Sequence, residues 1–160
     1  MTTSWILKNL SIGQLADHYS TFNWFPGDLT ECDRNSIEQD GIRFPLLVQQ
    51  ADDSKFRLID GFKRLSWFKF VQGTSFREYK QLQLPCLVIP AFASFREVVK
   101  IRLNTLTSDK KSFSGIHLCR VLKMLIEAGF SKNEIAFQVL PSLGLASSER
   151  LTGQLLDMQN

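Results

Sequence analysis

The residues best suited to chemistry in this sequence stand together at positions 60–64, in the order Asp-Gly-Phe-Lys-Arg. Residues 56–59 before them are apolar and β-prone, which predicts a short buried strand. Apolar residues then recur at helical spacing, so Lys63 and Arg64 fall in the first turn of a helix. Free N–H groups and the positive end of the helix dipole attract anions there, and Gly61 lets a ligand approach the backbone. The pattern predicts a phosphate-binding turn; the alternative is a strand–turn–helix whose basic residues face solvent.

The remaining reactive residues form no such group. His18 and His117 are isolated, which favours ordinary surface or half-buried residues over metal ligands. The three cysteines are far apart and form no C-x-x-C pair, so we expect free thiols in a reducing cytosol and no zinc site. Cys86 lies within an apolar segment and is expected to be inert core.

Composition limits the classes of protein that fit. A chain of 160 residues with 44% hydrophobic residues can form one domain, or one compact domain with a small addition. A net charge of +3 is too small to indicate nucleic-acid binding by bulk charge, so any anion site must be local. No apolar run approaches the roughly 18 residues of a membrane span, and no signal-peptide pattern opens the chain. We expect a cytoplasmic protein without a membrane partner.

The order of elements predicts a small α+β domain over residues 1–92 and a helical module over residues 93–160. In the first part we expect a mixture of strands and short helices. They are 5–15 (strand and turn), 28–39 (helix), 42–49 (strand), 56–59 (strand), 62–71 (helix) and 84–89 (strand). The strand at 42–49 is expected to form a hairpin with 56–59. In the second part we expect helices at 94–106, 114–128, 131–139 and from 147 onward, with a turn over 140–145. Ser94 with Glu97, and Ser131 with Glu134, have the spacing of capping boxes that start the first and third of these helices.

The last two of these helices have the lengths of a helix-turn-helix, at about residues 131–158. The exposed half of its second helix would carry the residues that contact bases and phosphates. We predict the DNA-binding residues to be Lys132, Ser147, Ser148, Arg150, Thr152 and Gln154. The alternative is a helical hairpin that packs on the preceding helix.

Three motifs in fixed order carry a resemblance to a known family. They are Gly41-Ile42-x-x-Pro45-Leu46-x-Val48, then Gly61-x-Lys63-Arg64, then the apolar segment 84–89 that begins Leu-Pro. Over residues 5–106 this order resembles the N-terminal domain of the ParB chromosome- and plasmid-partition family, which has a ParB/sulfiredoxin-like fold with a mixed sheet. The family continues with a helical, helix-turn-helix part, and residues 107–160 are similar in this respect.

The resemblance implies a CTP-like nucleotide with Mg²⁺, DNA as a partner and a possible homodimer, in a partition or transcription-related role. It implies nucleotide or phosphate binding by Asp60, Gly61, Phe62, Lys63, Arg64 and Asn104. The chain departs from the family pattern at three positions, because Phe62 and Leu103 stand where the family has Glu and Trp67 stands where it has Ala. Since Leu103 cannot serve a metal, we expect binding without hydrolysis, and no protein metal ligand.

Two other readings of the same fold remain open. Sulfiredoxin has Cys beside the motif Arg, where this chain has Phe62, which argues against that activity. The resemblance to a free-serine kinase, with its D-G-x-H-R motif, leaves a small-molecule phosphotransferase as an alternative. An enzyme would need a general base, for which the candidates are Glu31, Asp33 and Glu38. The second open alternative is a non-catalytic interaction module in which Phe62 and Trp67 fill the pocket.

Overall fold

The computed structural model describes residues 5–15, 22–24, 30–40, 44–51, 54–71, 82–107, 115–148, 150, 153–154 and 157. The chain divides into two compact units, Met1–Ala93 and Ser94–Asn160. The first is a mixed α and β unit, and the described part of the second is helical, which fits the predicted α+β class. None of the helices in these ranges combines the length and the apolar character that crossing a bilayer requires.

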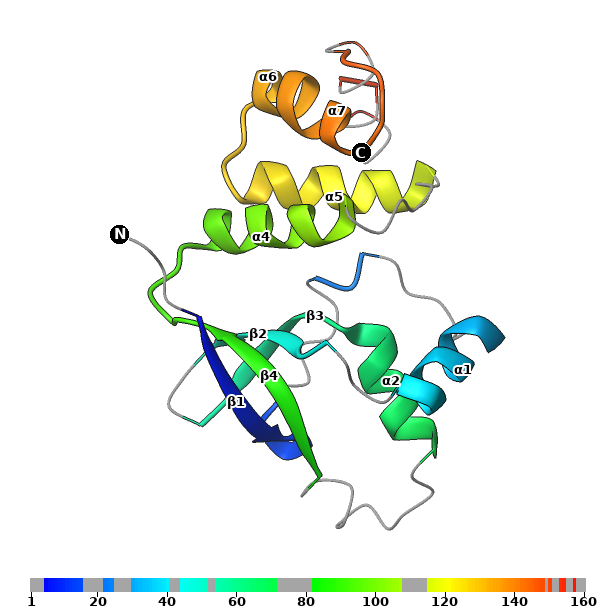
Figure 1. Ribbon diagram of the computed structural model, residues 1–160. Coiled ribbons are helices and arrows are strands. Elements are labelled where there is room, and N and C mark those ends of the chain that lie inside the picture. The colour runs from blue at the N-terminus through cyan, green and yellow to red at the C-terminus, as the bar shows by residue number, and fades with distance from the viewer. Residues whose placement is uncertain are drawn as a thin grey trace. The chain divides into compact units, whose positions relative to one another are not determined.

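The first unit is built on a four-stranded mixed sheet (Figure 1). Its strands are β1 (Ile6–Ser11), β2 (Leu46–Gln50), β3 (Phe56–Asp60) and β4 (Gln83–Ile89), in the spatial order β1-β4-β2-β3. The pairs β1/β4 and β2/β3 are antiparallel, whereas β2 and β4 are parallel. The predicted hairpin of β2 and β3 is present.

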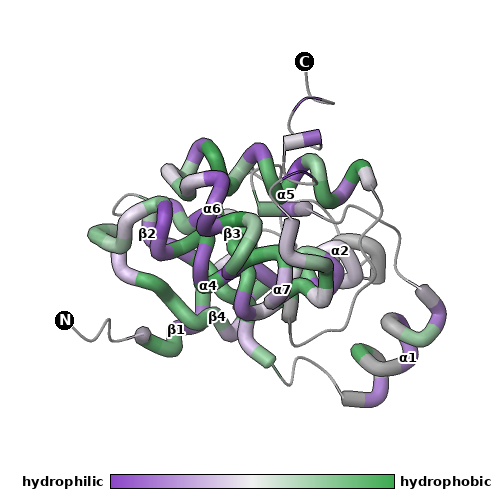
Figure 2. Tube along the Cα trace, turned by 90° about the horizontal axis from the view of Figure 1, so that it is seen from above, coloured by the Kyte–Doolittle hydropathy of each residue, from purple (hydrophilic) through white to green (hydrophobic). Residues whose placement is uncertain are grey.

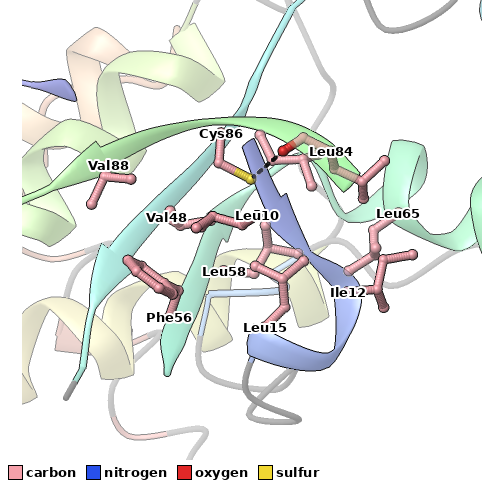
Figure 3. Packing of buried hydrophobic residues seen from close by; sticks show 11 residues of the cluster. Leu10, Ile12, Leu15, Val48, Phe56, Leu58, Leu65, Leu84, Cys86 and Val88 are labelled. Carbon is pink, nitrogen blue, oxygen red and sulfur yellow. Dashed lines mark hydrogen bonds between the residues drawn. The ribbon is translucent and has the colours of Figure 1, made fainter. Parts of the chain in front are cut away.

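A hydrophobic core cluster of this unit lies on one face of the sheet, where alternate residues of the strands point inward (Figure 3). Its fully or nearly buried members are Leu10, Ile12, Leu15, Leu46, Val48, Phe56, Leu58, Leu65, Leu84, Cys86 and Val88. Cys86 belongs to this cluster, and its thiol donates to the carbonyl of Leu84 at 3.4 Å. Burial raises the pKa of this thiol to about 12, which agrees with the expected inert core cysteine.

β2 is shorter than predicted at its start. The strand begins at Leu46, while Phe44 lies in a bend and Pro45 precedes the ladder; residues 42 and 43 of the predicted strand lie outside the described residues. The carbonyls of Phe44 and Pro45 both accept hydrogen bonds from Arg64. Arg64 therefore holds the two residues that precede β2.

Among the described residues of the first unit, two α-helices accompany the sheet. α1 spans Glu31–Asp40 and lies beside α2, which spans Phe62–Val71 as predicted (Figure 1). The predicted first helix began at 28, and positions 28 and 29 lie outside the described residues. Leu65 of α2 is fully buried, and Phe62 and Phe68 pack against the core cluster. This inward face positions the first turn of α2 at the end of β3.

The second unit contains α4 (Phe95–Thr107) and α5 (Gly115–Glu127), which lie side by side and run in opposite directions (Figure 1). The Ser94 N–H and hydroxyl both donate to the Glu97 carboxylate, so the predicted capping box at the start of α4 is formed. Hydrophobic and hydrophilic residues alternate around α5 (Figure 2), and its buried face includes Val121, Leu122 and Leu125. Such a face is typical of a helix packed on a core.

The third helix of this unit is longer than predicted. It runs through α6 (Lys132–Glu134), a π-helical segment η2 (Ile135–Val139) and α7 (Leu140–Ser142). The predicted turn over 140–145 is therefore wrong for its first three residues. We attribute the extension to the π segment, in which the Leu140 N–H bonds to the Ile135 carbonyl. Pro141 lacks an N–H, and in a regular α-helix its ring would clash with the carbonyl four residues earlier, a position that lies within the π segment.

Candidate functional site

The predicted phosphate-binding turn joins β3 to α2 through Gly61. This residue has φ +99°, a backbone conformation that side-chain-bearing residues rarely adopt, and its carbonyl accepts the first helical hydrogen bond from Leu65 N–H at 2.9 Å. A Cβ at Gly61 would lie 2.5 Å from Cδ2 of the buried Leu46. Conformation and space thus both require glycine at this position.

The guanidinium of Arg64 makes hydrogen bonds and an ion pair within the protein. Its Nη1 donates to the carbonyl of Phe44 and, at 3.0 Å, to that of Pro45, while its Nη2 lies 3.7 Å from Asp60 Oδ2. The side chains of Arg64 and Asp60 are 23% and 30% exposed, so the pair is partly screened by solvent. The guanidinium therefore ties the end of β3 and the first turn of α2 to the start of β2. A phosphate would have to displace these contacts to reach it.

The charges of this turn favour and oppose an anion at the same time. The first turn of α2 contains Lys63 and Arg64 and no acidic residue, which leaves the positive helix end uncompensated within the helix. Asp60 precedes the helix and brings a carboxylate to Arg64. The sequence pattern identified Lys63 and Arg64 as the cations of this turn. It did not predict the ion pair between Asp60 and Arg64.

The two aromatic residues that depart from the family pattern both lie on α2. Phe62 is half-buried and packs against the core cluster of the sheet. Trp67 is half-buried, and its ring meets Phe68 edge to face, with 5.0 Å between centroids. The indole Nε1 of Trp67 is buried without a hydrogen-bond acceptor among the described residues. Both rings are thus part of the packing around the turn.

Asn104 and Leu103, which the resemblance assigned to nucleotide and metal chemistry, belong to α4 in the second unit. Asn104 is exposed, whereas Leu103 is 6% exposed and forms part of the core. Over the described stretches of the chain, no three His, Cys, Asp or Glu side chains gather as metal ligands would. Leu103 therefore has a packing role.

The proposed general bases lie on α1. Glu31 is exposed at the start of this helix, and the side chains of Asp33 and Glu38 lie outside the described residues. The described geometry thus brings no general base to Arg64 other than Asp60, which is ion-paired with it.

The second candidate site is the helical segment that begins with α5. Gly129 has φ +79° and ends α5, with its own N–H bonded to the Ile126 carbonyl and the Phe130 N–H bonded to the Leu125 carbonyl. Together these two bonds form a Schellman motif, which satisfies the last carbonyls of the helix. The next helix starts immediately, because Ser131 and Glu134 form the predicted capping box. A tight helix–turn–helix connection results.

A second turn of the same kind follows the third helix. Gly144 has φ +76°, its N–H bonds to the Pro141 carbonyl, and the Leu145 N–H bonds to the Leu140 carbonyl. Residues 145–148 are non-helical, and helical backbone reappears at Arg150. A positive-φ glycine therefore follows the first helix in each of two successive connections. Gly129 lies between α5 and α6, and Gly144 lies between α7 and the helical backbone at Arg150.

Most of the predicted DNA-contacting side chains are accessible. Lys132, Ser147, Arg150 and Gln154 are exposed, Ser148 is half-buried, and Thr152 lies outside the described residues. Ser147 and Ser148 precede the helix instead of forming its first turn, which corrects the predicted start of that helix. The correction reflects the longer third helix, whose end at Ser142 leaves the glycine turn and these serines as the connection.

Net charge is distributed unevenly between the two units. Ser94–Asn160 contains nine basic and six acidic residues, whereas Met1–Ala93 contains ten of each. The formal excess of +3 therefore belongs entirely to the second unit. Among the acidic residues there, Glu97 and Glu134 are engaged in capping boxes.

Arg96 is a residue that sequence reasoning missed. It lies at the second position of α4, and its guanidinium donates to the Gly129 carbonyl and to the Glu134 carboxylate. The same guanidinium carbon lies 4.2 Å from the centre of the Phe130 ring. These partners are more than 30 residues away along the chain, so no local pattern could have identified them.

The sequence matches no protein-family model, and no curated protein is significantly similar to it. The functional assignment must therefore come from the residues and geometry of the chain itself.

Proposed function

We propose that this protein binds DNA through its second unit, in the manner of the ParB-like proteins that its motif order resembles. The observation that carries the proposal is the succession of capped helices and glycine-ended turns from α5 to Arg150. A helix-turn-helix needs a short, fixed connection and an accessible polar segment at the start of its second helix. The connection between α5 and α6 through Gly129 is short, and the exposed Ser147, Arg150 and Gln154 follow the Gly144 turn.

Electrostatics support the same unit as the DNA-binding part. Phosphate contacts supply most of the non-specific affinity for DNA, and they come mainly from Lys and Arg. The formal excess of +3 lies in Ser94–Asn160, and both Lys132 and Arg150 are exposed there. Because the excess is small, we expect weak binding that falls steeply with salt.

Fluorescence anisotropy with a labelled pool of duplex DNA, over a series of salt concentrations, tests the proposal. Each phosphate contact contributes about 0.9 to the slope of log K against log salt, so Lys132→Ala combined with Arg150→Ala should reduce the slope by about 1.8. The matched control is Arg120→Ala combined with Lys123→Ala, which removes the same charge from exposed positions of α5. Equal affinity and slope in the wild type and the first double variant would favour a helical hairpin without DNA contacts.

We propose further that the Gly61 turn of the first unit binds a nucleotide such as CTP, or phosphate alone. The specific observation in favour is a strand, a glycine with φ +99° and a ten-residue helix that opens with Lys63 and Arg64. Asp60 then acts as an internal competitor, because its carboxylate occupies the guanidinium that an anion would need. Binding requires Arg64 to exchange this carboxylate for the ligand.

Calorimetric titration with CTP, ATP, ADP and phosphate, with and without magnesium, separates the alternatives. We expect nucleotide binding without hydrolysis, stronger in Asp60→Asn than in the wild type, since the substitution removes the competing charge. Turnover of ATP or ADP with free serine would instead identify a small-molecule phosphotransferase. Absence of binding in both proteins would favour an interaction module whose turn is filled by its own contacts.

A further inference from the structure

We infer that Arg96 is a positioning residue that fixes the turn between α5 and α6, and with it the orientation of the proposed DNA-binding helices. The inference rests on the proposed function of the second unit. The contacts of Arg96 with Gly129, Phe130 and Glu134 together form the Arg96 clamp.

The Arg96 clamp holds both sides of the turn at once. The carbonyl of Gly129 belongs to the Schellman motif that ends α5, and the carboxylate of Glu134 belongs to the first turn of the next helix. The same carboxylate accepts the Ser131 N–H at 2.8 Å through its other oxygen. Glu134 therefore completes the capping box with one oxygen and the clamp with the other. A single planar guanidinium thus joins the end of one helix to the beginning of the next.

Phe130 provides the surface on which the guanidinium rests. Its ring is 7% exposed, and the Arg96 carbon lies 4.2 Å above the ring centre. Lys100, one turn further along α4, is more distant, with its Nζ 6.0 Å from the same centre. A stacked guanidinium with two fixed acceptors cannot be replaced by an ammonium group, because lysine lacks the planar fork. The clamp is specific for arginine.

The clamp should matter more for orientation than for stability. The side chains of Arg96 and Glu134 are 33% and 32% exposed, and ion pairs at such positions contribute little to the free energy of folding. A variant without the clamp would remain folded but would populate the binding-competent orientation less, and apparent affinity falls with that fraction.

DNA binding and hydrogen exchange in Arg96→Lys and Arg96→Ala test this inference. We expect Arg96→Lys to bind DNA about tenfold more weakly, equivalent to about 1.4 kcal/mol, with an unchanged salt slope because its charge is conserved. Amide exchange over residues 129–135 should become faster in both variants, without DNA present. The matched control is Lys100→Ala, which removes a charge from the same helix and leaves the clamp intact.

The outcomes separate this inference from the proposed function. Failure of the wild type to bind DNA at low salt would refute both the function and the role of Arg96 in it, whereas faster exchange would still identify the clamp. If the wild type binds and Arg96→Lys binds equally well with unchanged exchange, only the positioning role is refuted. A salt slope that falls by about 0.9 in Arg96→Ala would also refute it, since that loss marks a direct phosphate contact.

Discussion

Gly61→Ala should strongly destabilise the first unit, because two separate costs apply at this position. The left-handed conformation costs roughly 1–2 kcal/mol for a residue with a Cβ. The added methyl would also lie 2.5 Å from Leu46 Cδ2, and Leu46 is fully buried. Overpacking a core in this way typically costs about 1–3 kcal/mol, so we expect a total loss of about 2–5 kcal/mol.

Urea unfolding measured by tryptophan fluorescence is the appropriate assay. All three tryptophans, at positions 5, 24 and 67, lie in Met1–Ala93, so fluorescence reports on the first unit alone. The matched control is Gly144→Ala, which has φ +76° but no neighbouring atom within 4 Å of the added Cβ. Unfolding of this control is measured by far-ultraviolet circular dichroism of the helices. Its free energy of unfolding should fall only by the conformational cost of about 1–2 kcal/mol.

A double-mutant cycle then isolates the collision with Leu46. Leu46→Val alone should cost about 0.5–1.5 kcal/mol, as expected for the loss of one buried methylene group. In the Gly61→Ala background the same substitution removes the colliding Cδ2, so its cost should vanish or become a gain. Additive effects of the two substitutions, or equal losses in Gly61→Ala and Gly144→Ala, would refute the close approach of Leu46 to the turn.

Four shorter predictions concern thiol reactivity, titration and ion pairing. Under native, mildly alkaline conditions iodoacetamide should label the exposed Cys32 and spare Cys86, as mass spectrometry would show. Because the pKa of Cys86 is raised to about 12, its contribution to stability is present below the ordinary thiol pKa and is lost as pH rises toward 12; Cys86→Ala should remove this dependence. Hydrogen bonds from the Ser131 N–H and hydroxyl lower the pKa of Glu134, so the helix start loses stability as pH falls through that lowered value. In Ser131→Ala an NMR titration should give a Glu134 pKa between the wild-type and the ordinary value, because the variant keeps the backbone N–H; an unchanged pKa would show that the hydroxyl contributes nothing. Arg64→Lys should destabilise the first unit by about 1.5–3 kcal/mol in urea, the range for hydrogen bonds of charged groups, and an unchanged midpoint would show that the two carbonyls before β2 need no arginine.

Local patterns predicted the parts of the fold that depend on near neighbours in sequence. The capping boxes at Ser94 and Ser131, the end of α5 at Gly129 and the start of α2 at Phe62 each follow from residues within one turn of the backbone. The same is true of the β2–β3 hairpin. These features are set by hydrogen bonds that side chains and glycines make to adjacent backbone.

The features that the sequence did not predict depend on distant contacts. The carbonyls of Phe44 and Pro45, just before β2, are held by Arg64, which lies 20 and 19 residues away along the chain. Arg96 reaches Gly129 and Glu134 across 33 and 38 residues. The passage of the third helix through Pro141 depends on a π segment, for which propensity rules give no signal. In each case the partner of a side chain, or the spacing of helical hydrogen bonds, depends on tertiary packing.

The position of β1 has a consequence for how the protein acquires its structure. In the described sheet β1 pairs only with β4, and Ile6 pairs with Val88, 82 positions later. The first strand must therefore wait during synthesis until nearly the whole unit has been made, and closing so long a loop carries an entropic cost before any pairing rewards it. The helices of the second unit form from local hydrogen bonds and need no such delay. The second unit is thus expected to fold faster than the first. Until β4 has been made, β1 stays unpaired, and its Ile6 and Leu7, which are 51% and 66% exposed even in the folded state, offer apolar surface to a chaperone.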